Sequence, residues 1–499
     1  MMQNISTPYT PRSVGWICTG SSQLPTAKAM LDVEHTDSLV DHDNSGVCSG
    51  RMGTVGITIT HIPPPLRPAD IAVAAQRMMA SPMDIECILV MGAISGLANS
   101  DINPGDLIIN ALTEGDEDHS ESLPTQKRSL SQQAAILQRE VGHDGRWLSS
   151  NFSPAVSSSS DPLTSTQPPG SDVAKYPRLH YGNLGQDSQN SPRVEMVAAK
   201  SAPDFNAIAE GFRAGVSSRI PANSFPAFEN FTVDVVTILT VERYASSSDG
   251  TEKYAAANAL SYAKELIRGM SDGLTNSIAS LRGTETVVLP NPDIKVPPFE
   301  PQQLPRHGEA VLLVIPTANK SKGRLLREGC ENQKPKDVIM HSIAVPFDSG
   351  VGEQPYNEAG VVGVHTRISN ALRHLNAPEY QEMLVSKGIG TVLIASIENY
   401  IQLDNVERPT DYGVVVIHNA STGKTTAGLS WGVTVPPAYV DRARRFGFEG
   451  NPNYGRVTVG QVLAAHVPGL DKADFHSVLA RRSRYDLLSH TIDRLTIPW

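Results

Sequence analysis

The sequence lacks the features that define several common classes of protein. Its four cysteines are scattered over 499 residues without a Cys-x-x-Cys pair, which argues against a disulfide framework and against a zinc cluster. No apolar run reaches the roughly 18 residues that a membrane-spanning helix needs. The N-terminal residues have neither the basic region nor the apolar run of a signal peptide. We therefore expect a cytoplasmic protein with no membrane partner.

Positive charge is also scarce. The chain has 42 lysines and arginines against 52 aspartates and glutamates, a formal net charge of -10. Such an acidic chain is not expected to bind nucleic acid, so any phosphate site must be a local basic pocket. What the sequence does have is a 40% hydrophobic content and a length that predicts two or three domains.

Two stretches of biased composition divide the chain. Residues from about 112 to 175 are acidic and then rich in serine and proline, which predicts a flexible insertion. Residues 284–308 carry six prolines, which is typical of an extended linker. The sequence therefore predicts a first domain over 12–283, which includes the insertion, and a second domain over 309–499.

Strand and helix patterns alternate in both domains, and this alternation predicts two α/β domains with mostly parallel sheets. In the first domain we expect strands at 14–18, 53–61, 85–91 and 235–241, and helices at 25–31, 69–79 and 254–267. In the second we expect strands at 311–315, 338–345, 391–397, 412–418 and 427–435, and helices at 323–330, 363–375, 439–446 and 484–495.

The second domain opens on a candidate phosphate-binding turn. Its first predicted strand runs directly into Thr317-Ala318-Asn319-Lys320-Ser321-Lys322, so a hydroxyl, an amide and an ammonium group follow within six residues. Further along, Glu398 comes directly after the apolar strand 391–397, and carboxylates at strand ends can hold Mg²⁺ near substrate phosphates. Lys322 and Arg367 could then neutralise phosphate charge. Taken singly, Glu358 also fits a solvated loop charge and Arg367 a surface helix residue.

The order of these motifs resembles that of the inosine/xanthosine triphosphatase family, the non-canonical purine NTP phosphatases. Besides the turn, the matching segments are Ser349-Gly350-Val351 with Gln354-Pro355, Glu358, Gly363 with Arg367, Ile397-Glu398-Asn399, Asp411, Gly428-Leu429-Ser430, Gly455 to Gly460, and Ser483-Arg484. The resemblance covers residues 309–499. It implies Mg²⁺- or Mn²⁺-dependent hydrolysis of ITP and XTP to the diphosphate and phosphate, and a homodimer.

The resemblance also implies roles for individual residues. Lys322 and Glu398 would be catalytic, and Glu398 and Glu358 would ligate the metal. The substrate-binding residues would be Thr317, Asn319, Lys322, Arg367 and Ser430. The sequence departs from the family at Tyr400, where a glycine is usual, and in a long insertion over about 440–482.

Residues 12–270 resemble fungal nucleoside phosphorylase-type domains, through segments such as Val14 to Cys18 and Asp101 to Asp106. The functional motifs of this region are degenerate: Val197 replaces a ribose-binding glutamate of the family, and Arg243 replaces the acid that would protonate the purine. We therefore expect a scaffold here, or residual nucleoside phosphorylase activity. A third hypothesis is a non-catalytic nucleotide-binding or assembly protein with both domains degenerate.

Overall fold

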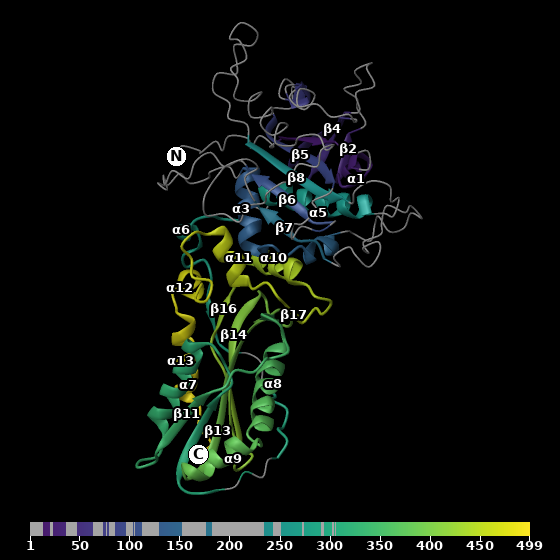
Figure 1. The fold of residues 1–499 in the computed structure, drawn as a ribbon. Coiled ribbons are helices and arrows are strands. Elements are labelled where there is room, and N and C mark those ends of the chain that lie inside the picture. The colour runs from purple at the N-terminus through teal and green to yellow at the C-terminus, as the bar shows by residue number, and fades with distance from the viewer. Residues whose placement is uncertain are drawn as a thin grey trace, which may run out of the picture. The chain divides into compact units, whose positions relative to one another are not determined.

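The computed structural model of the chain describes residues 13–19, 23–35, 47–62, 73–75, 77–78, 85–95, 103, 105–111, 129–151, 176–181, 234–242, 251–271, 274–290, 294–301, 304 and 306–499. The chain divides into two compact units, Met1–Gly273 and Leu274–Trp499 (Figure 1). Among the helices of those ranges, none is long and apolar enough to cross a membrane.

The first unit contains an eight-stranded sheet in the order β2-β3-β4-β1-β5-β8-β6-β7. Its strands are β1 (Ser13–Cys18), β2 (Val33–His35), β3 (Cys48–Met52), β4 (Val55–His61), β5 (Ile85–Ser95), β6 (Leu107–Ala111), β7 (Leu179–Tyr181) and β8 (Asp234–Glu242). Its helices are α1 (Gln23–Ala29), α3 (Leu130–Val141), the 3₁₀ helix η1 (Arg146–Asn151) and α5 (Thr251–Ser271). The strands predicted at 14–18, 85–91 and 235–241 and the helix predicted at 254–267 are confirmed.

This sheet is mixed, whereas the sequence predicted a mostly parallel one. Strands β1, β4, β5 and β8 pair in parallel, but β3 pairs antiparallel with β4 and β6 antiparallel with β8. Only two residues separate β3 from β4, and Gly53 adopts a φ of 60° between them. A connection this short closes a hairpin and cannot make the crossover that parallel strands require.

A helix interrupts the predicted insertion. Ser129 caps α3 by accepting a hydrogen bond from the backbone N–H of Gln132, whose side chain in turn accepts from the Ser129 N–H. The helix buries Leu130, Ala134 and Leu137, so its apolar face contributes to the core of the unit. Residues 112–128 and 152–175 of the predicted insertion lie outside the described residues. So do most of the helix predicted at 69–79, and Val197 and Arg243.

The second unit contains a seven-stranded sheet in the order β11-β10-β13-β14-β16-β9, with β15 also paired to β14. The strands are β9 (Val287–Val288), β10 (Ala310–Ile315), β11 (Met340–Ala344), β13 (Ile389–Gln402), β14 (Thr410–Asn419), β15 (Thr425–Leu429) and β16 (Gly432–Thr434), and a separate ribbon joins β12 (Gln354–Pro355) to β17 (Tyr454–Gly455). The helices are α6 (Ile278–Leu281), α7 (Lys320–Gln333), α8 (Ala359–His374), α9 (Pro378–Ser386), α10 (Pro437–Gly447), α11 (Val459–His466), α12 (His476–Leu479) and α13 (Arg484–Arg494).

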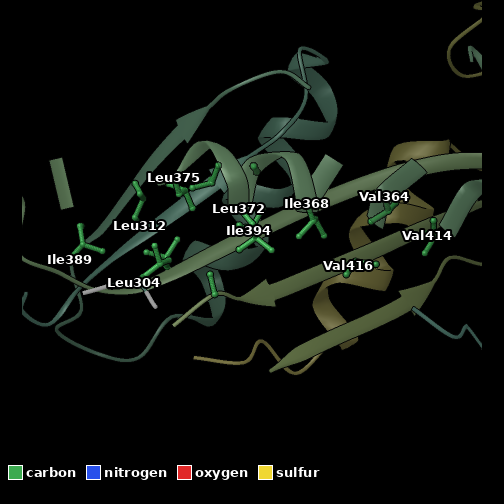
Figure 2. Packing of buried hydrophobic residues seen from close by; sticks show 14 of the residues in the cluster. Leu304, Leu312, Val364, Ile368, Leu372, Leu375, Ile389, Ile394, Val414 and Val416 are labelled. Carbon is green, nitrogen blue, oxygen red and sulfur yellow. The ribbon is translucent and has the colours of Figure 1, made fainter. Parts of the chain in front are cut away.

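Helices cover both faces of this sheet (Figure 1). Helix α8 packs on one face through Val364, Ile368 and Leu372, which recur at helical spacing and meet Ile394 and Val414 of the sheet (Figure 2). On the other face, residues of α7 and α13 form a second buried cluster with β10, β13 and β14. The second unit is therefore an α/β sandwich of three layers.

The proline-rich segment predicted as a linker belongs to this sandwich. Leu304 is buried in the cluster under α8, and Val288, Ile294, Val296 and Phe299 pack against it. Val287 and Val288 also form β9, which pairs antiparallel with β16. The boundary between the two units lies between residues 273 and 274, so the proline-rich segment belongs to the second unit. Its buried side chains add to the core of that unit instead of only joining two domains.

Strand β13 is longer than its neighbour β10, and this difference leaves space beyond the carboxyl end of β10. The parallel pairing of β10 with β13 ends at Val314 and Ile394, while β13 continues to Gln402 paired with β14. We predicted that the strand would end just before Glu398; instead, Glu398 lies inside β13. The side chain of Glu398 lies beyond the carboxyl end of β10, because β10 has already ended there and the chain has turned away into α7.

A buried histidine predicts how the stability of this unit depends on pH. Burial lowers the pKa of His418 on β14 to about 4, so the folded state binds a proton less readily than the unfolded state does. Above the unfolded pKa near 6.5 the histidine is neutral in both states and does not reduce the free energy of unfolding. As pH falls from 6.5 toward 4, the unfolded state takes up a proton that the folded state does not, and the free energy of unfolding decreases. The expected loss is on the order of 2–3 kcal/mol. Urea unfolding at pH 7 and pH 4 should show this extra loss in the wild type relative to His418→Asn, and equal losses would contradict it.

Candidate functional site

A pocket of about 970 Å³ opens in the second unit beside the point where β10 ends. Its wall includes the turn 317–319, the loop 346–354, the adjacent strands β13 and β14, and residues between 449 and 475. The volume lies in the range of small-molecule sites. The segment 440–482, which was predicted to be an insertion relative to the resembling family, thus supplies part of the pocket wall.

The turn after β10 forms the start of a helix at this pocket. Asn319 caps α7: its side-chain oxygen accepts from the backbone N–H of Lys322 at 3.0 Å, and the hydroxyl of Thr317 accepts from the backbone N–H of Asn319 at 3.1 Å. The positive end of the α7 dipole therefore lies at the pocket, where it favours an anion.

One carboxylate at the pocket has two cationic partners. The Nη1 atom of Arg367 lies 2.6 Å from Oε2 of Glu398, and Nζ of Lys322 lies 3.6 Å from Oε1. Lys322 also donates to the backbone carbonyl of Ile397 at 3.4 Å. Gly363, one turn before Arg367, lies so close to Val351 that a side chain there would displace it, and Glu398 packs beside the same glycine. Helix α8 can therefore bring Arg367 to the carboxylate.

A second carboxylate from the neighbouring strand lies in the same pocket. Asp411 of β14 is buried, and its Oδ2 atom accepts from Nη2 of Arg484 at 3.2 Å. Its Oδ1 atom lies 3.4 Å from Nε2 of the buried His476. Asp411 and Arg484 belong to the motifs that resemble the triphosphatase family, but the sequence predicted no site role for them or for His476.

Burial and neighbouring charges shift the pKa values of several groups at the pocket. Burial lowers the pKa of Lys322, and the nearby Arg484 and Arg367 lower it further, against the opposing effect of Glu398. Burial also lowers the pKa of His476, which favours its neutral form. For Asp411, burial raises the pKa, but the charge of Arg484 and the contact with His476 outweigh burial and hold it below its usual value. Lys322, Arg367 and Arg484 therefore lie close to Glu398 and Asp411, in a pocket whose wall as a whole has as many acidic as basic side chains.

The structure brings most of the predicted site residues together, but not all of them. Lys322, Glu398 and Arg367, with Thr317 and Asn319, line the pocket. Ser430 is absent from the wall: its hydroxyl accepts from the Gly413 N–H and donates to the Trp431 carbonyl, where β15 and β16 separate. Glu358 is exposed at the start of α8 and also lies outside the pocket wall.

Tyr400, which stands where the resembling family has a glycine, points away from the pocket. Its ring lies in the core under α8, where Gly360 leaves the space that the ring fills. Tyr400→Ala should therefore lower the free energy of unfolding by about 3–5 kcal/mol through the cavity it leaves. We expect unchanged affinity for phosphate ligands at a temperature where the variant is folded. Urea unfolding and calorimetry of Tyr400→Phe and Tyr400→Ala check this, and an altered affinity with intact stability would contradict it.

The donor atoms at the floor suit a divalent ion that arrives with phosphate. Among the described residues, no group of three or more His, Cys, Asp or Glu side chains could hold a metal ion. Mg²⁺ commonly binds through one or two carboxylates, several waters and substrate phosphates, so the single carboxylate of Glu398 fits such an ion. Glu358 lies outside the pocket, so its predicted role as a second ligand gains no support from its position.

Comparisons with known proteins give a distant similarity of fold. No protein-family model matches the chain, and no protein of curated function matches it. A futalosine hydrolase mutant of Helicobacter pylori strain 26695 is similar at 12% identity and a TM-score of 0.27, over 53% of this chain and 100% of that one. A methylthioadenosine/S-adenosylhomocysteine nucleosidase of Colwellia psychrerythraea 34H, in complex with adenine, is similar at 11% identity and a TM-score of 0.27, over 52% and 95%.

The protein VC0702 from Vibrio cholerae is similar at 16% identity and a TM-score of 0.27, over 36% of this chain and 90% of that one. The hydrolase and nucleosidase matches each cover about half of this chain. At these TM-scores the similarity carries no argument about activity. The resemblance of residues 309–499 to the inosine/xanthosine triphosphatases gains no support from these matches and stays a prediction.

Proposed function

We propose that the second unit is a nucleoside-triphosphate phosphohydrolase that converts deaminated purine nucleotides such as ITP and XTP to the diphosphate and phosphate. One observation carries this proposal: Lys322, Arg367 and Arg484 converge with two carboxylates on the floor of one pocket. A cluster of cations beside a helix N-terminus is suited to a polyphosphate, and the adjacent carboxylate is suited to the metal ion that accompanies it.

Binding of a triphosphate would exchange partners at Glu398. Phosphate oxygens would take over the Lys322 ammonium and the Arg367 guanidinium, which now neutralise the Glu398 carboxylate at 3.6 and 2.6 Å. The released carboxylate would then be free to bind the metal ion of a metal–triphosphate complex. Phosphate and metal are therefore expected to bind cooperatively, because each removes the charge that opposes the other.

The same residues would stabilise the transition state. Phosphoryl transfer spreads negative charge over the oxygens of the transferred group, and cations already fixed in place stabilise that charge without reorganisation. Lys322, Arg367 and Arg484 are held by contacts with the protein before any ligand arrives. A bound Mg²⁺ would add charge neutralisation and activate a water molecule. The choice of ITP and XTP rests on the family resemblance of residues 309–499.

The test is an assay of the full-length protein with ITP, XTP, GTP and ATP in the presence of Mg²⁺, with separate measurement of phosphate and pyrophosphate. The proposal expects phosphate release, fastest with ITP or XTP. Release of pyrophosphate would mean that the bond between the α- and β-phosphates is cleaved, and would contradict the proposed products. Nucleotide binding without turnover of any triphosphate would contradict hydrolysis and would leave a nucleotide-binding module.

A further inference from the structure

We propose that His476 is a positioning residue that, through Asp411, keeps the guanidinium of Arg484 directed into the pocket. This inference rests on the proposed phosphate-binding function of that pocket. His476 begins the short helix α12, lies in no motif of the family that the sequence resembles, and is almost fully buried. It contacts Asp411, so it would act on substrate only through that carboxylate and Arg484.

Arg484 is fixed at both ends by one short segment of chain. Its backbone N–H donates to Oδ1 of Asp474 at 2.7 Å, which ties the start of α13 to the residues just before α12. Its guanidinium lies 5.4 Å from the centre of the Phe475 ring and 3.2 Å from the Asp411 carboxylate. The ring of His476 stacks on that of Phe475, with 4.1 Å between the ring centroids. Residues 474–476 therefore contact both Arg484 and Asp411.

The histidine determines which oxygen of Asp411 is left for the arginine. Nε2 of His476 lies 3.4 Å from Oδ1, close enough to occupy that side of the carboxylate, and Arg484 contacts Oδ2 through a single nitrogen atom. The lowered pKa of His476 favours a neutral ring, which does not add a fourth positive charge to the floor. A neutral ring with its proton on Nε2 would present an N–H donor to Oδ1 of Asp411. Without that donor, both buried oxygens of Asp411 would be open to the guanidinium, and a two-pronged pair would draw Arg484 away from the phosphate.

Two substitutions separate this role from simple packing. His476→Phe keeps an aromatic ring stacked on Phe475 but has no N–H donor, whereas His476→Gln loses the ring and retains a side-chain N–H that can reach Asp411. A packing role predicts that phenylalanine is the better replacement. The positioning role predicts the opposite order for phosphate binding.

The experiment measures binding of inorganic tripolyphosphate to the full-length protein by calorimetry, with thermal unfolding as a check on folding. We expect about tenfold weaker binding by His476→Phe and a change of less than about threefold by His476→Gln. We also expect Arg484→Met to weaken binding in the wild type but to add little in His476→Phe, because both changes remove the same contact.

Each outcome decides a different question. Equal binding by the wild type and His476→Phe, or weaker binding by His476→Gln than by His476→Phe, would overturn the positioning role and leave the proposed function intact. Full additivity of Arg484→Met and His476→Phe would also overturn it. Failure of the wild type to bind tripolyphosphate, with or without Mg²⁺, would overturn both the proposed function and this inference. If His476→Phe does not fold, His476→Leu takes its place, because leucine also lacks an N–H donor: weaker binding by His476→Leu than by His476→Gln supports the positioning role, and equal binding by His476→Leu and the wild type would overturn it.

Discussion

Glu398→Gln should lower the rate of triphosphate hydrolysis by about 10²–10³-fold or more, while binding of metal-free tripolyphosphate becomes tighter. The carboxylate is the protein ligand proposed for the metal ion, and in the free protein it also neutralises Lys322 and Arg367. An amide cannot replace the negative charge in either role. Steady-state assays with Mg²⁺ and calorimetry without metal measure the two effects separately.

The same substitution should also change stability in a way that ligand reverses. Loss of the charge leaves two partly buried cations without their counterion, so the ligand-free variant should unfold at a lower temperature than the wild type. Tripolyphosphate should raise the unfolding temperature of the variant more than that of the wild type. Glu358→Gln is the comparison, since this exposed carboxylate lies outside the pocket. Weaker metal-free binding by Glu398→Gln would contradict the proposed exchange of partners.

Lys322→Met should weaken triphosphate binding by about 2–3 kcal/mol, which corresponds to a factor of about 30–150 in the dissociation constant. The methionine keeps the apolar length of the side chain and removes the buried ammonium at the pocket floor. Glu398 retains Arg367 at 2.6 Å, so the loss of stability should be small compared with the loss of affinity.

Lys320→Met is the matched control for this prediction. Lys320 lies in the first turn of the same helix but is exposed and is absent from the pocket wall. It should bind triphosphate within about twofold of the wild type, because exposed charges contribute little. Equal effects of the two substitutions would mean that general electrostatic attraction, and not the buried ammonium, binds the phosphate.

The fold could be predicted from the sequence where local patterns determine it. The strands β10 and β13 are visible in the sequence as nearly continuous apolar runs, and helix α8 as apolar residues at helical spacing. The direction of strands depends on the lengths of connections and on partners far apart in the chain. Seven residues join β13 to β14, which is too short for a crossover helix, and these strands pair antiparallel.

The candidate site was predictable in part for the same reason. Lys322 and Glu398 were identified because each follows a recognisable strand pattern, and adjacent strands bring them within 3.6 Å. His476 gives no such signal: a single histidine in a segment of mixed composition becomes informative only through its contact with Asp411 of β14 in the folded chain. Ser430 was misplaced because the predicted continuous strand at 427–435 is in fact broken there, which turns its hydroxyl toward backbone groups.

Both carboxylates of the floor lie on one hairpin, β13–β14, whereas their cationic partners come from helices on opposite faces of the sheet. Arg367 belongs to α8, and Lys322 and Arg484 belong to α7 and α13. The electrostatic potential in the pocket thus depends on the distance between each helical layer and the sheet, because that distance sets the separation of each cation from its carboxylate. A core substitution under either layer, at a distance from any ligand, would change the spacing of one cation from its carboxylate and could be detected as a change in phosphate affinity.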